Sequence, residues 1–265
     1  MDLHLKDRHA LITGGSKGIG LACAKVLLAE GARVTLVSRD MGSLIEAGRR
    51  LGQDIAGSGP RIELRATDLQ DAAAAGHLVA EIDDATPVDI LINSAGAARR
   101  TPPDELTVAH WHAAMQSKYF TYMHVMDPLI KRMAARGAGA IVNVIGAGGK
   151  VARPHHLPGG AANAALMLVS AGLANAYAPR GIRVNAVNPG TTRTERMQEG
   201  LEADARLNKI SVDTALARTI TAAPLGRIAS PEEISDAVVF LCSARASYVT
   251  GAILSMDGAL TPIVA

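Results

Sequence analysis

The chain has 265 residues, of which 48% are hydrophobic, 3% aromatic and 20% charged, and its formal net charge is +2. This small charge and the scarcity of aromatic side chains argue against a polyanion-binding surface, so we expect no nucleic-acid partner. A chain of this length can bury a large core, and we expect one α/β domain over residues 1–265.

The sequence gives no indication of a signal peptide, a membrane span, a disulfide or a metal site. The charged N-terminus leads directly into the first predicted strand, so we expect no signal peptide. The sequence has no uninterrupted apolar run near the roughly 20 residues that cross a bilayer, which favours a cytoplasmic protein without a membrane partner. Cys23 and Cys242 lie in predicted helices and should be free thiols. We expect no metal site, because His, Cys and carboxylate residues do not cluster at ligand spacing.

The first predicted strand leads into a glycine-rich turn. Ala10-Leu11-Ile12 is typical of a short buried strand, and an amphipathic helical pattern runs from Leu21 to Glu30. Glycines between them let the backbone approach a pyrophosphate, whose charge the free N–H groups at the helix start then meet. The predicted contacts to a dinucleotide here are Gly14, Ser16, Lys17, Gly18, Ile19 and Gly20.

The end of the second predicted strand, residues 33–37, indicates which dinucleotide is bound. A protein that selects NAD usually has a carboxylate here, which accepts from the ribose 2′-hydroxyl. This chain has Ser38 and Arg39, which suit a 2′-phosphate, and Lys17 adds a second cation. We therefore predict NADP(H) in preference to NAD(H). The alternative is that Lys17 and Arg39 are solvated surface charges. Asp40 is expected to point away from the ribose or to pair with Arg39.

Four later segments complete the pattern: Asp68-Leu69, Asn93-Ser94-Ala95-Gly96, the stretch from Gly181 to Thr194, and the stretch from Pro224 to Gly258. With the glycine turn they resemble the short-chain dehydrogenase/reductase (SDR) family over essentially the whole chain. The resemblance implies a single-domain Rossmann fold, a doubly wound, mostly parallel sheet with helices on both faces. It also implies cofactor contacts from Asp68, Leu69, Asn93, Ala95, Gly96, Pro189, Gly190, Thr192 and Thr194.

The same resemblance locates a catalytic site in which the usual residues are absent. SDR enzymes use a serine, a tyrosine and a lysine, with an asparagine on the preceding helix. At those positions this chain has Gly146, Gly159, Asn163 and Lys118, respectively. The register up to Asn185 holds without a gap, and a shift of a few residues restores neither the tyrosine nor the lysine.

Lys118 is the candidate replacement. Glycine and asparagine are shorter than tyrosine and lysine, so the ammonium could extend into space left open at Gly159 and Asn163. Our hypothesis is that it bridges to the ribose or the substrate oxygen. Burial beside the oxidised nicotinamide would lower its pKa toward neutrality, which suits a general acid or base. The alternative is that Lys118 only fills or solvates the void.

The loop before the helix near Gly159 holds further candidates. His155 and His156 could titrate near neutral pH, and Lys150 and Arg153 could recognise an anionic substrate. For all four the alternative is polar surface. The glycines of this region predict an unusually wide cavity floor; they are Gly146, Gly148, Gly149, Gly159 and Gly160.

Residues 195–223 resemble the family's substrate lid. Apolar side chains near helical spacing predict two short helices over the cleft, or ordinary packing against the body. They are Met197, Leu201, Leu207, Ile210, Val212, Leu216 and Ile220. The C-terminal helix and strand resemble those through which the family usually forms tetramers, so we expect a homo-oligomer, most simply a tetramer.

Three functions remain open. The first is an NADP(H)-dependent oxidoreductase that transfers hydride to or from an unidentified small carbonyl or alcohol substrate, using residues around Lys118. The second is a redox-silent NADP-binding protein that acts as a sensor or partner subunit. The third is a non-redox lyase or isomerase that uses the nucleotide as a scaffold. Loss of a positioned general acid handicaps hydride transfer without forbidding it, since proximity and orientation also lower the barrier.

Overall fold

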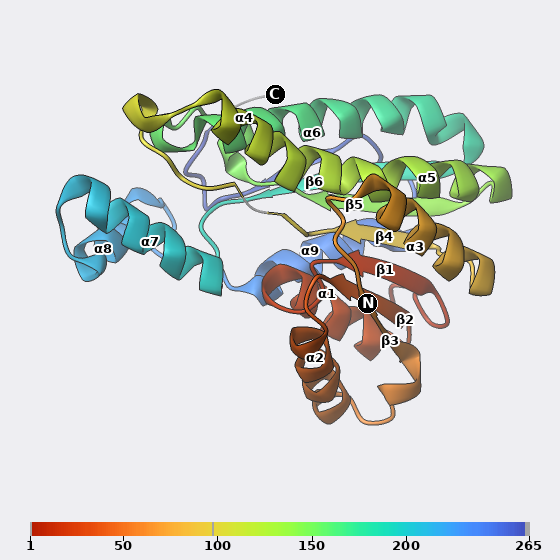
Figure 1. Ribbon diagram of the computed structural model, residues 1–265. Helices are drawn as coiled ribbons and strands as arrows, with labels where there is room; N and C mark the ends of the chain where they lie inside the picture. Colours follow the sequence, from red (N-terminus) through yellow and green to blue (C-terminus); the bar gives the residue numbers. More distant parts are fainter. Residues whose placement is uncertain (1, 97, 263–265) are drawn as a thin grey trace.

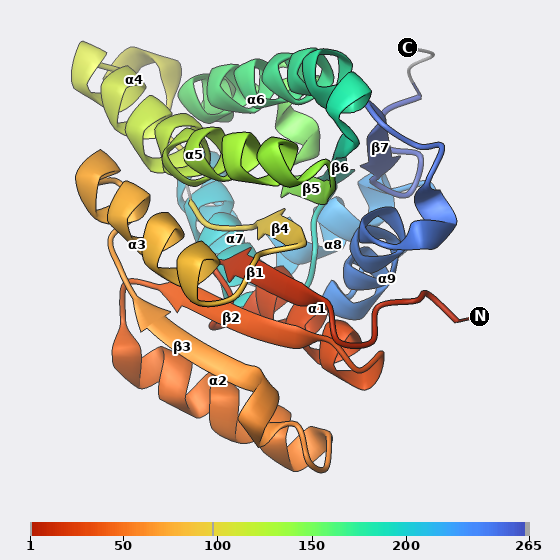
Figure 2. The same ribbon diagram turned by 90° about the vertical axis from the view of Figure 1, so that its right-hand side faces the viewer.

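The computed structural model describes residues 2–96 and 98–262. Within them, seven strands form one sheet in the order β3-β2-β1-β4-β5-β6-β7, between layers of helices (Figures 1 and 2). Every strand pair is parallel, so the predicted doubly wound Rossmann fold is confirmed. The strands are β1 (His9–Thr13), β2 (Arg33–Ser38), β3 (Ile62–Ala66), β4 (Ile90–Asn93), β5 (Gly139–Val144), β6 (Ile182–Pro189) and β7 (Ile253–Met256).

The helices divide between the two faces of the sheet. One face packs against α1 (Gly18–Ala29), α2 (Met41–Asp54) and α9 (Pro231–Cys242). The other packs against α3 (Ala72–Ala85), α5 (Thr121–Arg136) and α6 (Leu157–Tyr177). The remaining helices are α4 (Val108–Ala114), α7 (Glu195–Asn208) and α8 (Val212–Ala222).

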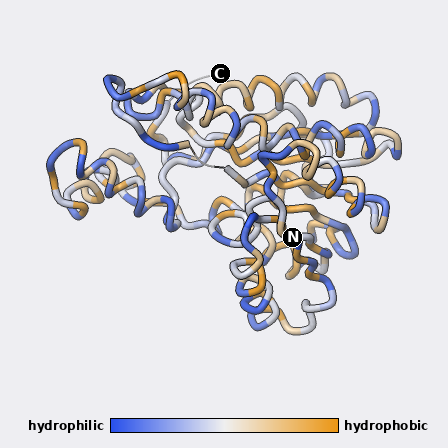
Figure 3. The backbone as a smooth tube through the Cα atoms, viewed as in Figure 1, coloured by the Kyte–Doolittle hydropathy of each residue, from blue (hydrophilic) through white to orange (hydrophobic). Residues whose placement is uncertain are grey.

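Neighbouring residues of a central strand supply different cores. In β1, Ile12 joins the core under α1 and α9, whereas Leu11 joins the core under α3 and α5. This follows from the alternation of side chains along a strand, and burial on both faces explains why these strands read as continuous apolar runs. Figure 3 shows the hydrophobic residues along the strands in the middle of the molecule. Cys23 and Cys242 are buried free thiols, as predicted.

A buried polar chain joins the carboxyl ends of the central strands. Asn93 accepts from the Thr13 hydroxyl at 3.3 Å and donates to the side chain of Asn143 at 3.0 Å. Asn143 donates in turn to the Ser170 hydroxyl on α6 at 2.9 Å. Because buried polar groups are costly unless they are paired, these bonds fix the edge of the sheet at which the glycine turn lies.

Residues 154–180 are long and apolar enough to cross a membrane by length and composition alone. The core helix of a soluble protein passes the same test, and here the stretch consists mainly of α6, which lies against β6. Its side chains Ala162 and Leu166 are fully buried in the protein. Of the most apolar 18-residue window in this stretch, 39% is buried inside the protein.

Candidate active site

The glycine turn has the tight geometry that the sequence predicts. Gly14 has a φ of +67°, and a Cβ placed on it would lie 2.8 Å from the Ser94 carbonyl oxygen. A Cβ on Gly20 would lie 2.3 Å from the Gly14 carbonyl oxygen. Side chains at either position are therefore excluded by backbone. Helix α1 begins at Gly18, three residues before the apolar pattern at Leu21, so its first N–H groups belong to the turn itself.

Two further loops meet this turn at the carboxyl edge of the sheet. Thr194, after β6, is close to Gly18: a Cβ on that glycine would lie 3.3 Å from the threonine Cγ2. Gly96, after β4, has a φ of +99° and packs on the Ser117 carbonyl oxygen. Residues predicted to contact the cofactor from the loops after β4 and β6 thus lie beside the glycine turn, at the carboxyl edge where open α/β sheets have their ligand crevice. Asn93 is fully buried and supports the sheet through the polar chain described above.

Of the two residues after β3 that were expected to contact the cofactor, only one has an accessible side chain. Leu69 is 4% exposed, and its carbonyl oxygen lies 2.9 Å from His124 Nδ1. Asp68 is exposed and accepts from the N–H of Gln70 at 3.1 Å. Of this pair, the aspartate is accessible to a ligand and the leucine side chain packs in the core.

The region predicted to hold a 2′-phosphate contains several charges. Asp40 turns away from it, accepting from the Ser43 N–H at 2.7 Å at the start of α2. Arg39 is exposed. Lys17 Nζ pairs with Glu195 Oε2 at 2.5 Å, and both side chains are solvent-exposed, so this ion pair is weak. Between the turn and α2 lies a cavity of about 260 Å³. Its lining includes Arg50, a cation that sequence spacing did not single out.

Lys118 lies in η3 (Met115–Phe120), a π-helical turn between α4 and α5. Such turns are rare in proteins, and those that occur are often found at functional sites. The side chain is only 7% exposed, and its ammonium donates to the Ile145 carbonyl oxygen at 3.3 Å, just beyond the end of β5. Burial, reinforced by the charge of Arg196, lowers the pKa of Lys118 to about 7.

Asn163 and Gly146 lie beside the same strand end. Asn163 is 2% exposed and donates from Nδ2 to the Gly146 carbonyl oxygen at 3.4 Å. Its Oδ1 is buried and lacks a hydrogen-bond partner among the described residues. The structure thus gathers Lys118, Gly146 and Asn163 at the end of β5, leaving one buried acceptor unpaired.

The expected space beside Gly159 is filled. A Cβ on Gly159 would lie 2.2 Å from Cε1 of His156, so the imidazole takes the place of any side chain there. The predicted wide floor is wrong elsewhere too: Met167 packs on Gly149, and a Cβ on Gly160 would lie 2.8 Å from the Gly148 carbonyl oxygen. At Gly149, Gly159 and Gly160, neighbouring groups occupy the space that a side chain would take, so no void is left.

The remaining candidates from the loop before α6 lie in different surroundings. Lys150 Nζ donates to the Ser255 hydroxyl at 3.2 Å and so is directed toward β7. His155 is half-buried, and its carbonyl oxygen accepts from the Thr101 N–H at 3.1 Å. Arg153 is exposed, but its charge lowers the pKa of His156. Of the two histidines, His156 is the one whose ring packs against Gly159.

The segment predicted to form a lid contains the two helices α7 and α8. They pack on each other through Leu201, Ala205 and Ala215 and project from the body of the molecule (Figure 1). Arg100 approaches α7, donating to the Gly200 carbonyl oxygen at 3.4 Å. The helices were correctly located, but the apolar contacts that they make are mainly with each other.

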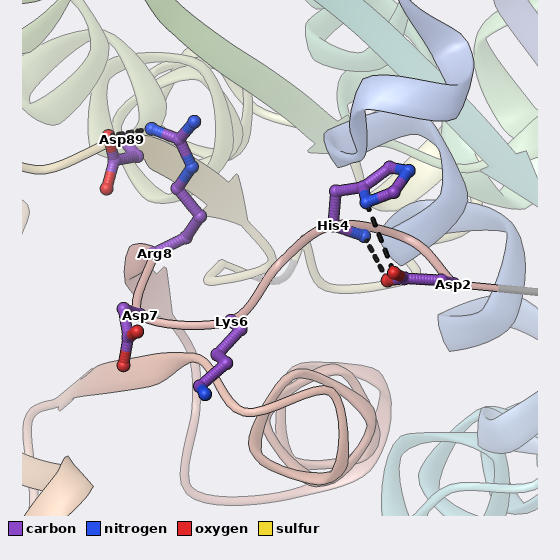
Figure 4. A pocket seen from close by; sticks show the side chains of 6 residues that line it. All are labelled: Asp2, His4, Lys6, Asp7, Arg8 and Asp89. Atoms are coloured by element: carbon purple, nitrogen blue, oxygen red, sulfur yellow. Dashed lines mark hydrogen bonds and ion pairs between the residues drawn. The ribbon is translucent and has the colours of Figure 1, made fainter.

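A second cavity lies at the opposite edge of the sheet, near the N-terminus (Figure 4). It has a volume of about 460 Å³ and is lined by Asp2, His4, Lys6, Asp7, Arg8 and Asp89. Arg8 and Asp89 form an ion pair at 3.1 Å at the amino ends of β1 and β4. Ligands of open α/β sheets bind at the carboxyl ends, so this cavity is not the nucleotide crevice.

Comparison with known proteins agrees with this geometry. The family described as "Enoyl-(Acyl carrier protein) reductase" matches residues 14–261. Galactitol 2-dehydrogenase (L-tagatose-forming) of Cereibacter sphaeroides is 37% identical over 257 residues, which cover 95% of this chain and 94% of that protein. The L-sorbose reductase of Gluconobacter frateurii, solved with NADPH and L-sorbose, has a TM-score of 0.90 at 30% identity and covers 100% of both chains.

A third relative is also a solved structure. It is a short-chain oxidoreductase of Pseudomonas aeruginosa PAO1, solved with NADPH and described as containing an atypical catalytic center. Its TM-score is 0.86 at 30% identity, covering 98% of this chain and 100% of that one. The matches span nearly the whole sequence and agree with the parallel sheet and the glycine turn. The chain therefore belongs to the short-chain dehydrogenase/reductase family of oxidoreductases.

Proposed function

We propose that this protein binds NADP(H) and transfers hydride between the nicotinamide and a carbonyl or alcohol substrate, with Lys118 handling the proton. The observation that carries the proposal is a buried ammonium on the ligand-binding edge of the sheet. Lys118 is 7% exposed and donates to the Ile145 carbonyl oxygen, beside Gly146 and Asn163. A buried cation is costly, so its presence at this edge favours a function there.

The residues of the crevice fit NADP(H). Gly14 and Gly20 admit a backbone approach that a Cβ would block, and the start of α1 offers free N–H groups to a pyrophosphate. Arg39, Arg50 and Lys17 are the cations available to a 2′-phosphate. The relatives solved with NADPH support the same choice. When bound, NADPH supplies the hydride.

Lys118 suits the proton step in both directions. A pKa of about 7 leaves much of the ammonium protonated at neutral pH, so it can give a proton to the oxygen of a carbonyl that gains hydride. In the oxidation of an alcohol, the neutral amine takes that proton back. Asn163 Oδ1, buried and unpaired among the described residues, is an acceptor for a ribose hydroxyl. The Pseudomonas relative, solved with NADPH, is also described as containing an atypical catalytic center.

The substrate panel follows from the relatives, which act on galactitol and L-sorbose. We propose ketoses and polyols as the first compounds to test. Single-turnover oxidation of bound NADPH should occur with at least one carbonyl compound. NADPH binding without oxidation across the panel would favour a redox-silent protein, and product formation without a change in the nicotinamide would favour a lyase or isomerase.

The proposed assembly is a homotetramer formed through α9 and β7. Strand β7 is the last strand of the sheet, and an open edge with apolar side chains tends to pair. Leu254 on β7 is 41% exposed and Phe240 on α9 is 38% exposed. Light scattering after size-exclusion chromatography should give a tetramer mass, which Leu254→Lys should reduce; a monomeric wild-type chain would refute the assembly.

A further inference from the structure

The His156 imidazole and a side chain at position 159 cannot coexist. A Cβ on Gly159 would lie 2.2 Å from His156 Cε1, 2.6 Å from Nε2 and 2.8 Å from Ala98 Cβ. Ordinary carbon contacts are about 3.5–4.0 Å, so these positions overlap. The glycine is therefore what allows the imidazole to reach this place.

The ring is held from its other side and from its backbone. A Cβ on Gly148 would lie 3.0 Å from His156 Cδ2 and 3.6 Å from Asn163 Nδ2, so imidazole, amide and glycine border one space. The His156 N–H donates to the Arg153 carbonyl oxygen at 2.8 Å, and the residue occupies the N-cap position of α6. A half-buried ring anchored in this way is preorganised, which is what a group that contacts substrate requires.

The ring is neutral and retains unused hydrogen-bonding capacity. Burial, with the charges of Lys118, Arg100 and Arg153, lowers the pKa of His156 to about 4. A neutral imidazole has one N–H donor and one acceptor nitrogen. Nδ1 is buried without a hydrogen-bond partner among the described residues. The influence of Lys118 on this pKa places the ammonium and the ring in one electrostatic environment.

We propose that His156 is a catalytic residue that donates a hydrogen bond to the substrate oxygen, occupying the place of the side chain that Gly159 lacks. This rests on the proposed function. In reduction, the carbonyl carbon gains hydride from NADPH, which becomes NADP⁺, and the C=O π pair moves to the oxygen. His156 stabilises the developing oxyanion, and the Lys118 ammonium supplies the proton that completes the alcohol. A neutral imidazole can polarise a carbonyl in this way.

The packing part of the proposal has a test that needs no activity. Gly159→Ala should lower the melting temperature of the wild-type protein, because the new methyl group meets the ring. The same substitution should cost clearly less in a His156→Ala background, where only the Ala98 contact remains. Equal costs in both backgrounds would overturn the assignment of the ring to this place.

The chemical part is tested by single-turnover NADPH oxidation. His156→Ala should slow hydride transfer by about 10²–10³-fold, the usual effect of losing one oxyanion donor. His156→Gln, which keeps an N–H donor, should recover part of this loss. The dissociation constant of NADPH should stay unchanged in both, which separates loss of chemistry from misfolding. His77→Ala, on an exposed part of α3, is the matched control and should be neutral.

The two proposals fail in different ways. Absence of hydride transfer in the wild-type protein would refute the proposed function, whereas the stability cycle would still report on the ring. Hydride transfer that is unchanged in His156→Ala would refute the catalytic role of His156 and leave the proposed function standing. An equal loss in the Ala and Gln variants with weakened NADPH binding would assign His156 a structural role only.

Discussion

Replacing the buried lysine should make the protein more stable, by an amount that depends on pH. At neutral pH the native state must hold the Lys118 ammonium in a site that is 7% exposed. One pKa unit corresponds to about 1.4 kcal/mol, so lowering the pKa from 10.5 to about 7 corresponds to about 5 kcal/mol against folding. Lys118→Met has a similar shape without the charge and should remove much of this cost.

The sign of the pH dependence follows from proton binding. Below pH 7 both folded and unfolded states carry the proton, and the full cost is present. Between pH 7 and 10.5 the unfolded state binds more protons, so wild-type stability rises with pH relative to the variant. The advantage of Lys118→Met should therefore shrink from pH 6 to pH 9.5, by roughly 2–3 kcal/mol after allowance for relaxation around the charge.

Urea unfolding of both proteins without nucleotide, at pH 6, 8 and 9.5, measures this difference. Lys25→Met is the matched control, because that lysine is exposed in an ion pair with Asp54 and should show no such trend. Besides burial, the group that lowers the pKa of the ammonium is Arg196 from α7; His156, with a pKa of about 4, is uncharged at all three pH values. An advantage that is the same at all three pH values would refute the reasoning that Lys118 is a buried, weakened base.

Three other predictions test the crevice and the frame. Arg39→Ala should raise the KM for NADPH about tenfold, about 1.4 kcal/mol, with little change for NADH, measured by initial rates; equal effects on both would contradict a role at the 2′-phosphate. Gly20→Ala should abolish NADPH binding by fluorescence titration, since its Cβ would lie 2.3 Å from a backbone oxygen, whereas Gly52→Ala, with nothing within 4 Å, should bind normally. Asp83 is 2% exposed and forms an ion pair with Arg136 at 2.7 Å. Asp83→Ala should lower the free energy of unfolding by about 3–5 kcal/mol, measured by chemical denaturation, because it leaves the partner charge unpaired.

The sequence predicted the features whose cause is local. The run of Leu11 and Ile12 predicted a short buried strand, which the structure shows to be buried on both faces. The glycine turn predicted a backbone geometry that Gly14 and Gly20 adopt. The two thiols were assigned correctly because their helices present them to the core. These signals are short-range: periodicity and the missing Cβ need no knowledge of distant residues.

The arrangement around Gly159 was not predictable in the same way. The resemblance to the family identified a missing side chain at Gly159, but which group fills the space depends on how the 3₁₀ turn before α6 directs His156. Likewise, the pairing of Lys17 with Glu195 joins residues far apart in the chain. A signal for His156 was present in the sequence, three residues before Gly159, but only the three-dimensional packing distinguishes it from His155.

The most direct test of Lys118-assisted hydride transfer is single-turnover oxidation of NADPH deuterated on the transferred position, with the wild-type protein and Lys118→Met. The account predicts deuterium in the alcohol product of the wild-type reaction and a rate at least about 10²-fold lower in the variant at pH 7, with NADPH affinity unchanged. Deuterium transfer at equal rates in both proteins, or no transfer from the wild-type protein to any carbonyl in the panel, would contradict it.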